Sequence, residues 1–544
     1  MKIVSILILI FISTSNTYSQ YSRQWVQRLN GTANNYDIAN TMYLDEQSNS
    51  YIYSTLSNTN NQTDICAVKY SPDGNMLWKF EYNNSGNGLD QLQDAYKDLS
   101  NFSYITGYIS ESGNVKVITI KLSPAGDSLW TCIAAIPDYV NLISHSITID
   151  NNNNIYVLLD GRHAVTSRSD FIILKYNSSG VLLNQKIFQG STEGDDNGLK
   201  ILCDADNNLF VGVNSFYFST NIDMILYKLD SNLNEIYSKK INGAVSSDDR
   251  LVAMKLDNNN DVVLTGRVTN SAGSTDIGIY KFQNSNGNLL WQRMYDGAGH
   301  DTDIPFAITT DNQNKVYVTG YSRNADTLGS EDIITLKYEN NGSLAWSVLY
   351  NGTANGIDQG ITITTDSQNN VYVGGGSDHG GIHLEYITLK YNETGSLLWK
   401  AAYSNSATPE DFVYKIAVNS QQDIFISGIS FSSSTDYDIA TIKYSREVSV
   451  NPINETVNDF KLYGNFPNPF NPSTTIKFYN PSRNFISIKI FDLNGKEIAV
   501  SGNIFLNTGN YEYIFNAGKL SSGIYLYKIF YGNMFKSGKM ILAK

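Results

Sequence analysis

A unit of about 53 residues occurs eight times in this sequence, and this repeat limits the possible folds more than any other feature. Each copy carries an apolar run that ends in a lysine followed by tyrosine, leucine or phenylalanine. The eight lysines, spaced 52 to 56 residues apart, are Lys69, Lys121, Lys175, Lys228, Lys281, Lys337, Lys390 and Lys443. Self-similarity at one period is typical of solenoids and propellers, in which each repeat is one supersecondary unit.

The copy from Asp303 to Gly352 illustrates the pattern inside one repeat. Its apolar and β-branched segments predict four short strands, which lie at 305–310, 316–320, 332–338 and 344–350. An Asx-rich turn at 311–314 and the hairpin signal Asn341-Gly342 separate them. Four short strands in each copy predict the blade of a β-propeller. Helical solenoids are excluded, because no run of useful length has a 3.6-residue period.

The two ends of the repeat array predict how it closes. The last copy stops after Lys443 and Tyr444, without the tryptophan-bearing fourth strand. The segment 24–31 precedes the first copy and matches 290–297, with a glycine six residues after the tryptophan in both. We expect this N-terminal strand to complete the last blade, giving an all-β propeller of eight blades with no exposed strand edge.

The first residues have the pattern of a secretory signal peptide. Lys2 is followed by an apolar run to Ile12 and then by small and polar residues. The run is too short for a bilayer, which needs about 20 residues; a short membrane anchor is the alternative. We interpret residues 1–19 as a signal peptide, with cleavage after Ser19, and no later stretch reaches spanning length.

Composition excludes several classes of protein. The net charge of −13 and a pI near 4.9 argue against a nucleic-acid binder, which needs a basic face for phosphates. Cys66, Cys132 and Cys203 are too few for a disulfide scaffold and are interpreted as buried, unpaired small hydrophobes. A hydrophobic share of 41% suffices for large cores, so global disorder is excluded.

One acidic position repeats with the blades and is the main candidate binding site. Seven of the eight copies have an aspartate eight residues before the turn residue that ends the first strand, and the third copy has Leu142. These aspartates are Asp37, Asp90, Asp196, Asp249, Asp303, Asp358 and Asp411. If the first strand lines the channel, they form an acidic ring at one mouth that attracts basic partners or a cation such as calcium. The alternative is that each aspartate ties down a loop or a neighbouring blade.

Other side chains give weaker indications. His379 and His383 are a candidate metal site, but they lie in a glycine-rich loop and form no zinc-protease helix motif. A second acidic series that opens the third strand is interpreted as structural; it comprises Asp64, Asp170, Asp223, Asp276, Asp332, Glu385 and Asp438. The tryptophans hold one repeat position and are interpreted as core residues. With no nucleophile elbow, phosphate loop or convincing Cys/His pair, we predict no catalytic residue and no further cofactor.

Residues 24–444 resemble the β-propeller repeats of bacterial surface proteins named for seven blades. The shared pattern is Asp…Asn-x-Tyr-Val-x-Gly, then Asp-Ile-x-x-x-Lys-Tyr, then Gly-x-Leu-x-Trp. This chain has eight copies, and copies two to four depart from the pattern, with Lys116 in place of aspartate and Asn184 in place of tryptophan. The resemblance implies a propeller, to which we assign residues 20–448.

The pattern changes after a linker at 449–458, in a region that holds half of the ten prolines. Short alternating segments there predict strands, which lie at 486–491, 511–515, 524–530 and 539–542. Short strands separated by turn signals over about 90 residues predict a small immunoglobulin-like β-sandwich at 459–544.

This C-terminal block closely resembles the type A C-terminal sorting domain of the type IX (Por) secretion system. The motif residues that carry the resemblance are Asn465, Pro467, Asn468, Pro469, Phe470, Asn471, Pro472, Asp492, Gly495, Gly523, Tyr525 and Lys544. The resemblance implies that the type IX machinery is a partner and that the chain crosses the outer membrane of a Bacteroidetes-type bacterium to the cell surface or the medium. Residues 454–544 hold ten basic and five acidic side chains, which suits a separate address module on an acidic cargo.

These observations favour an exported, monomeric propeller that acts as a non-enzymatic binding or scaffold module, in adhesion or in recognition of an extracellular glycan or protein. Loops that vary between the copies would do the recognising. The alternative is a propeller-type polysaccharide hydrolase or lyase, for which we expect an asymmetric acidic cluster in one blade. A stalk or coat protein is the third possibility.

Overall fold

The computed structural model describes residues 21–446 and 460–544, apart from 60–61, 85–87, 112, 189–193, 244, 324–329, 379, 381–382, 406–409 and 533. The predicted signal peptide and linker lie outside the described residues. The described parts form forty strands and contain no helix, and so none that could cross a membrane. They fall into two compact units: Ser22–Ser445 is one, and the C-terminal block belongs to the other.

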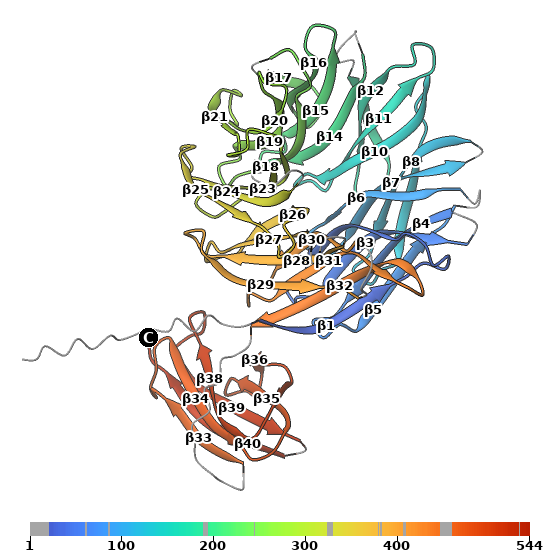
Figure 1. Ribbon diagram of the computed structural model, residues 1–544. Coiled ribbons are helices and arrows are strands. Elements are labelled where there is room, and N and C mark those ends of the chain that lie inside the picture. The colour runs from blue at the N-terminus through green and yellow to red at the C-terminus, as the bar shows by residue number, and fades with distance from the viewer. Residues whose placement is uncertain are drawn as a thin grey trace, which may run out of the picture. The chain divides into compact units, whose positions relative to one another are not determined.

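Eight four-stranded antiparallel sheets make up the first unit (Figure 1). In seven of them the four strands are consecutive in the chain and pair in chain order. The first four sheets are β2 (Ile38–Leu44), β3 (Ser50–Asn58), β4 (Gln62–Tyr70) and β5 (Met76–Tyr82); β6 (Asp90–Lys97), β7 (Ser103–Glu111), β8 (Asn114–Leu122) and β9 (Ser128–Ala134); β10 (Tyr139–Ile149), β11 (Ile155–His163), β12 (Ser169–Tyr176) and β13 (Leu182–Phe188); and β14 (Asp196–Cys203), β15 (Leu209–Tyr217), β16 (Asn221–Leu229) and β17 (Glu235–Ile241). The next three are β18 (Arg250–Leu256), β19 (Val262–Thr269), β20 (Thr275–Phe282) and β21 (Leu289–Tyr295); β22 (Asp303–Thr310), β23 (Val316–Arg323), β24 (Glu331–Tyr338) and β25 (Leu344–Tyr350); and β26 (Asp358–Thr365), β27 (Val371–Asp378), β28 (Leu384–Tyr391) and β29 (Leu397–Tyr403).

The eighth sheet joins the two ends of the array. It contains β30 (Phe412–Val418), β31 (Ile424–Ser432) and β32 (Asp436–Arg446), and β1 (Tyr21–Leu29) pairs with β32 as its fourth strand (Figure 1). The first strand of each sheet contacts the first strand of the next, and β30 contacts β2. Repeated four-stranded sheets in this order confirm the prediction of an all-β propeller fold.

The repeated lysine and tryptophan join each sheet to the next one. Lys121 Nζ and Trp130 Nε1 both donate to the carbonyl oxygen of Ser178, at 3.2 and 3.1 Å. The same double contact recurs in other copies. Because it is made at the outer strands, most of these tryptophans are half-buried, and they pack against the cores between neighbouring sheets, while Trp291 is itself a core residue.

The glycine of the hairpin between the third and fourth strands completes this contact. Gly126 has a φ of 91°, and a Cβ there would lie 2.7 Å from Cδ2 of Trp78 in the preceding sheet. Only glycine accepts both this backbone conformation and the approach of the ring. The spacing between glycine and tryptophan in the sequence is therefore set by contacts between neighbouring repeats.

The core is built between neighbouring sheets. Tyr51 and Ile65 of the first sheet, for example, pack in one buried cluster with Leu92, Ile105 and Ile118 of the second. The three cysteines are unpaired, and only Cys66 is fully buried. Because each sheet shares its core with its neighbours, single repeats cannot bury their apolar faces alone.

The C-terminal unit contains two sheets around one core. One sheet is β33 (Lys461–Phe466), β34 (Ser473–Asn480) and β38 (Gly509–Asn516), and the other is β35 (Asn484–Phe491), β36 (Glu497–Val500), β37 (Ile504–Leu506), β39 (Gly523–Tyr531) and β40 (Met534–Leu542). Ile476 and Phe478 of the first sheet share the buried cluster with Ile488, Ile529 and Met540 of the second. Two sheets with a common core form the predicted β-sandwich.

Candidate functional site

The seven repeated aspartates at the start of the first strands are buried, with at most 1% of each exposed. Asp37 Oδ2 accepts the N–H of Gly31 at 2.7 Å, and its Oδ1 accepts the N–H of Ser57 at 2.6 Å. Asp249 makes the same contacts with Gly243 and Thr269, at 2.5 and 3.0 Å. Each of these two carboxylates therefore ties the loop before its first strand to the second strand of the same sheet. This geometry favours the loop-tying alternative, and ligand binding at the ring stays a prediction.

Burial changes the acidity of these carboxyl groups. Removal from water raises the pKa of Asp37 and of Asp90 to about 6, although backbone N–H donors oppose the shift. Burial likewise raises the pKa of Asp249, Asp358 and Asp411. The folded protein thus holds protons on these groups at pH values where the unfolded chain has already lost them.

We expect the propeller to be more stable at pH 5 than at pH 7.5. Between about pH 4 and pH 6 the folded state binds more protons at Asp37 and Asp90 than the unfolded state does, so stability falls as pH rises through this window. After allowance for solvent screening, each group should contribute about 1–2 kcal/mol. Melting temperatures at constant ionic strength measure the effect. An Asp37→Asn variant should show a shallower pH dependence, and an unchanged slope would contradict the assignment.

The histidine pair lies in the loop before β28. His379 lies outside the described residues, while His383 is half-buried and its Nδ1 has no hydrogen-bond partner among the residues that are described. In the described part of the chain, His383 belongs to no group of three potential metal-binding side chains. A metal site at His379 and His383 stays a prediction.

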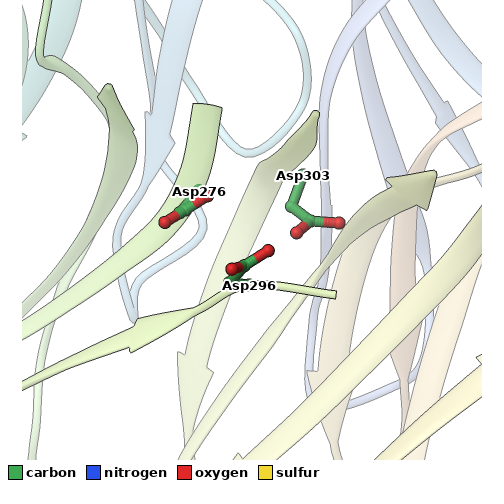
Figure 2. Close-up of side chains that lie close together, drawn as sticks. All are labelled: Asp276, Asp296 and Asp303. Atoms are coloured by element: carbon green, nitrogen blue, oxygen red, sulfur yellow. The ribbon is translucent and has the colours of Figure 1, made fainter. Parts of the chain in front are cut away.

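One group of three carboxylates does come together among the described residues, between the fifth and sixth sheets. Asp276 lies in β20, Asp296 follows β21, and Asp303 begins β22; Figure 2 shows their carboxyl groups side by side. One oxygen from each lies within 4.8 Å of the others. Asp276 and Asp303 are buried, and Asp296 is exposed to solvent.

One departure from the repeat pattern contributes to this cluster. Seven residues before the repeated aspartate, the other copies whose loops align carry an amide or a serine rather than an aspartate. The equivalents of Asp296 are Asn30, Asn83, Gln189, Asn242, Asn351 and Ser404. The fifth repeat therefore gains a carboxylate that its neighbours lack.

The fifth repeat, like most of the others, has no basic residue at the fourth-strand position that can pair with the aspartate of the third strand. Arg28 pairs with Asp438 at 2.8 Å, and Lys240 pairs with Asp223 at 2.7 Å, so a basic side chain neutralises the aspartate of the third strand in these copies. At the equivalent position the fifth repeat has Met294. Asp276 instead accepts a neutral hydrogen bond from Asn270 at 2.8 Å.

The cluster has the chemistry of an acid–base or cation site. Burial raises the pKa of both Asp276 and Asp303. His300 Nδ1 lies 2.7 Å from Asp296 Oδ2, and this hydrogen bond raises the pKa of the histidine. Three carboxylates so placed can bind a hard cation such as calcium or divide the roles of acid and base.

Sequence reasoning missed this cluster, because Asp276 was interpreted as structural and Asp296 was not singled out. The signal was present as the replacement of asparagine by aspartate in one aligned loop. A shallow depression on the third sheet was also missed. It has a volume of about 300 Å³ and is lined by Pro137, Asp138, Tyr139, His163 and Ile187.

The C-terminal motif residues form one structural unit with the last strand. Asn468 Oδ1 accepts the N–H of Ile541 at 2.8 Å, and its Nδ2 donates to the carbonyl of Lys539 at 3.2 Å. Phe470 is buried, its N–H donates to the carbonyl of Ile541 at 2.9 Å, and its carbonyl accepts the N–H of Ala543 at 3.0 Å. The proline-rich segment is thereby fixed along β40.

The remaining motif residues hold turns and the chain end. Asp492 caps the turn that contains Gly495, whose φ is 80°. Tyr525 donates its hydroxyl to the carbonyl of Ser521 at 2.7 Å. Lys544 donates from Nζ to the carbonyl of Gly518 at 2.6 Å. The motif residues thus stabilise the packing of this unit, in addition to forming any surface that a partner contacts.

Comparison with known families identifies the C-terminal unit. Residues 465–543 match the model of the secretion system C-terminal sorting domain, which confirms the resemblance found in the sequence. A sorting domain of this kind directs export by the type IX secretion system to the cell surface or the extracellular space. No curated protein matches the chain.

Solved structures also match the chain, at low identity and low TM-score. A protein of unknown function from Dyadobacter fermentans is 11% identical, with a TM-score of 0.35 over 57% of this chain and 98% of that one. The C-terminal domain of Pseudomonas aeruginosa PilY1 is 12% identical, with a TM-score of 0.36 over 72% and 92% of the two chains. The β-propeller domain of the Trilobed protease from Pyrococcus furiosus is 7% identical, with a TM-score of 0.35 over 62% and 89%. At these values the likeness carries no argument about function.

Proposed function

We propose that the exported part of this protein is a closed, eight-bladed propeller that serves as a non-enzymatic binding module at the cell surface or in the medium. The observation that carries the proposal is that the repeated side chains are engaged in structural contacts. The repeated aspartates, lysines and tryptophans make contacts within or between sheets. Recognition is therefore left to the positions that differ between copies.

The third sheet is the most divergent of these copies. It has Leu142 in place of the ring aspartate and Asn184 in place of the tryptophan. The depression at Tyr139 and His163 lies on this same sheet. The third repeat thus combines a divergent sequence with a concave surface, which supports a ligand-contacting role for it.

A screen of residues 20–448 against polysaccharides and extracellular proteins, scored for both binding and turnover, tests the proposal. A binding module should give saturable binding without turnover. Binding of no glycan or protein would favour a stalk or coat role, and turnover would favour an enzyme.

An Asp249→Asn variant should distinguish a structural role of this aspartate from a role in ligand binding. Asparagine offers one acceptor oxygen where the carboxylate accepts from both Gly243 and Thr269, so we expect a loss of about 1–3 kcal/mol in the free energy of unfolding. Ligand affinity should stay unchanged. A variant that melts like the wild type but loses ligand or cation binding would reverse this assignment.

A propeller-type polysaccharide hydrolase or lyase is the second candidate, and the cluster of Asp276, Asp296 and Asp303 favours it. Glycosidases use two carboxyl groups about 5 to 9.5 Å apart, one of them with a raised pKa. If the screen finds turnover, Asp296→Asn should reduce it about 100-fold or more. The control is Asn351→Asp, which places an aspartate at the equivalent loop position of the next repeat and should leave turnover unchanged.

A further inference from the structure

The inner edges of the sheets carry a group of charges that the repeat pattern does not explain. All eight first strands contain a β-bulge at the same position. The extra residue of the bulge changes the direction in which the next side chain points. These residues are Thr41, Asp94, Ser146, Lys200, Ala253, Ala307, Thr362 and Lys415. Charged side chains therefore occupy this level in only three of the eight repeats.

Contacts across the repeats place this level at the axis of the array. Lys200 Nζ in the fourth sheet lies 2.7 Å from Asp94 Oδ2 in the second, so the ion pair passes the third sheet. Ser146 of that third sheet donates its hydroxyl to the same oxygen at 3.0 Å. Side chains from three successive sheets can meet at one carboxylate only where the sheets converge.

Two further lysines interact with this pair. Lys415 of the eighth sheet interacts electrostatically with Asp94 and Lys200, and Lys255 of the fifth sheet interacts with Lys200. Lys200 and Lys415 thus share the carboxylate of Asp94, and Lys255 adds a third positive charge near Lys200. No ion pair or hydrogen bond to the Nζ of Lys255 or Lys415 exists in the described residues.

An excess of two positive charges at this place is costly without a counterion. Partial desolvation by the surrounding sheets lowers the pKa of Lys255, which is still exposed to solvent, and of Lys415, which is half-buried, and the charge of Lys200 lowers each further. Between Lys200 and Lys415, the sheets on the other side contribute only Ala253, Ala307 and Thr362 at this level. These short side chains place no large group between the two ammonium groups.

We propose that the axial lysines Lys200, Lys255 and Lys415 bind a single oxyanion: a sulfate, phosphate or carboxylate group. Three ammonium donors match the several acceptor oxygens of such a group, and charge-assisted hydrogen bonds are the strong ones. The site is separate from the variable loops, so it does not depend on the binding role proposed above.

Calorimetric titration of the mature full-length chain with sodium sulfate, at pH 7 and low ionic strength, tests the proposal. We expect one site per chain and at least tenfold weaker binding in Lys415→Met and in Lys255→Met. Lys400→Met removes the same charge from exposed β29 and should change affinity less than twofold. Titrations with phosphate, glucuronate and a sulfated polysaccharide distinguish a free ion from an acidic sugar group, and binding of any of them supports the site.

The proposal is overturned if no anion binds, if Lys415→Met binds like the wild type, or if Lys400→Met loses as much affinity. Misfolding is controlled by the melting temperature in the absence of anion. Because Lys415 has no ion pair with any described residue, its replacement by methionine should leave that temperature unchanged or raise it. A tenfold loss of sulfate affinity in a variant of undiminished stability therefore reports on the site itself.

Discussion

Replacing Trp25 with alanine is expected to lower the free energy of unfolding of the propeller by about 3–5 kcal/mol. Trp25 Nε1 donates to the carbonyl of Pro72 at 2.9 Å, and the ring packs on Gly74 and beside Phe425. Lys443 donates to the same carbonyl at 3.2 Å, so one oxygen joins the first strand and the last repeat to the first sheet. Urea titration followed by fluorescence measures the loss.

The Trp25→Ala substitution should also release β1 from its pairing with β32. β32 is the strand with which β1 pairs, so release of β1 exposes a strand edge that promotes association. We therefore expect Trp25→Ala to form oligomers in size-exclusion chromatography and to be cut by protease near its N-terminus. A peptide of residues 21–31 added in trans should suppress the oligomers.

Trp78→Ala is the matched control. Trp78 donates to the carbonyl of Pro124 at 3.1 Å and packs on Gly126, which is the same contact between the first and second sheets. It should cost a similar free energy but leave β1 in place, with no early N-terminal cut and no rescue by the peptide. A Trp25→Ala protein as stable and monomeric as the wild type would contradict closure by the first strand.

The repeat in the sequence was sufficient to predict the strands of the propeller. Constant spacing of the Lys-Tyr motif, alternating apolar residues and Asx turns predicted four strands per copy, and β25 has the predicted bounds. The reason is local: each strand and turn is encoded by its own residues, and the copies repeat the signal. The short strand β37 in the C-terminal unit was missed, because three residues are too few to show an alternating pattern.

The environment of the acidic residues was not predictable in this way. Period and spacing place Asp37 at the start of a strand, but the direction of its carboxylate depends on where the Gly31 loop passes. The interaction of Asp94 with Lys200 joins residues 106 positions apart and exists only because sheets converge at the axis. Such contacts depend on the assembled array, and no single repeat encodes them.

Deleting residues 454–544 is expected to abolish delivery to the cell surface and leave the propeller in the periplasm. These residues include the whole match to the secretion system sorting domain, at 465–543. The propeller has its own cores, so the truncated cargo should fold and accumulate rather than be degraded. Cell fractionation and protease treatment of intact cells measure where the protein resides.

A single substitution tests whether the fixed position of the proline-rich segment matters for sorting. Asn468→Ala removes both side-chain hydrogen bonds to β40, to Lys539 and Ile541, and should lower surface display at least several-fold. Asn503→Ala, at an exposed position of the same unit, is the control and should be displayed normally. Normal surface display of the 454–544 deletion would refute the sorting role of the domain. Normal display of Asn468→Ala would refute only the importance of its contacts with β40.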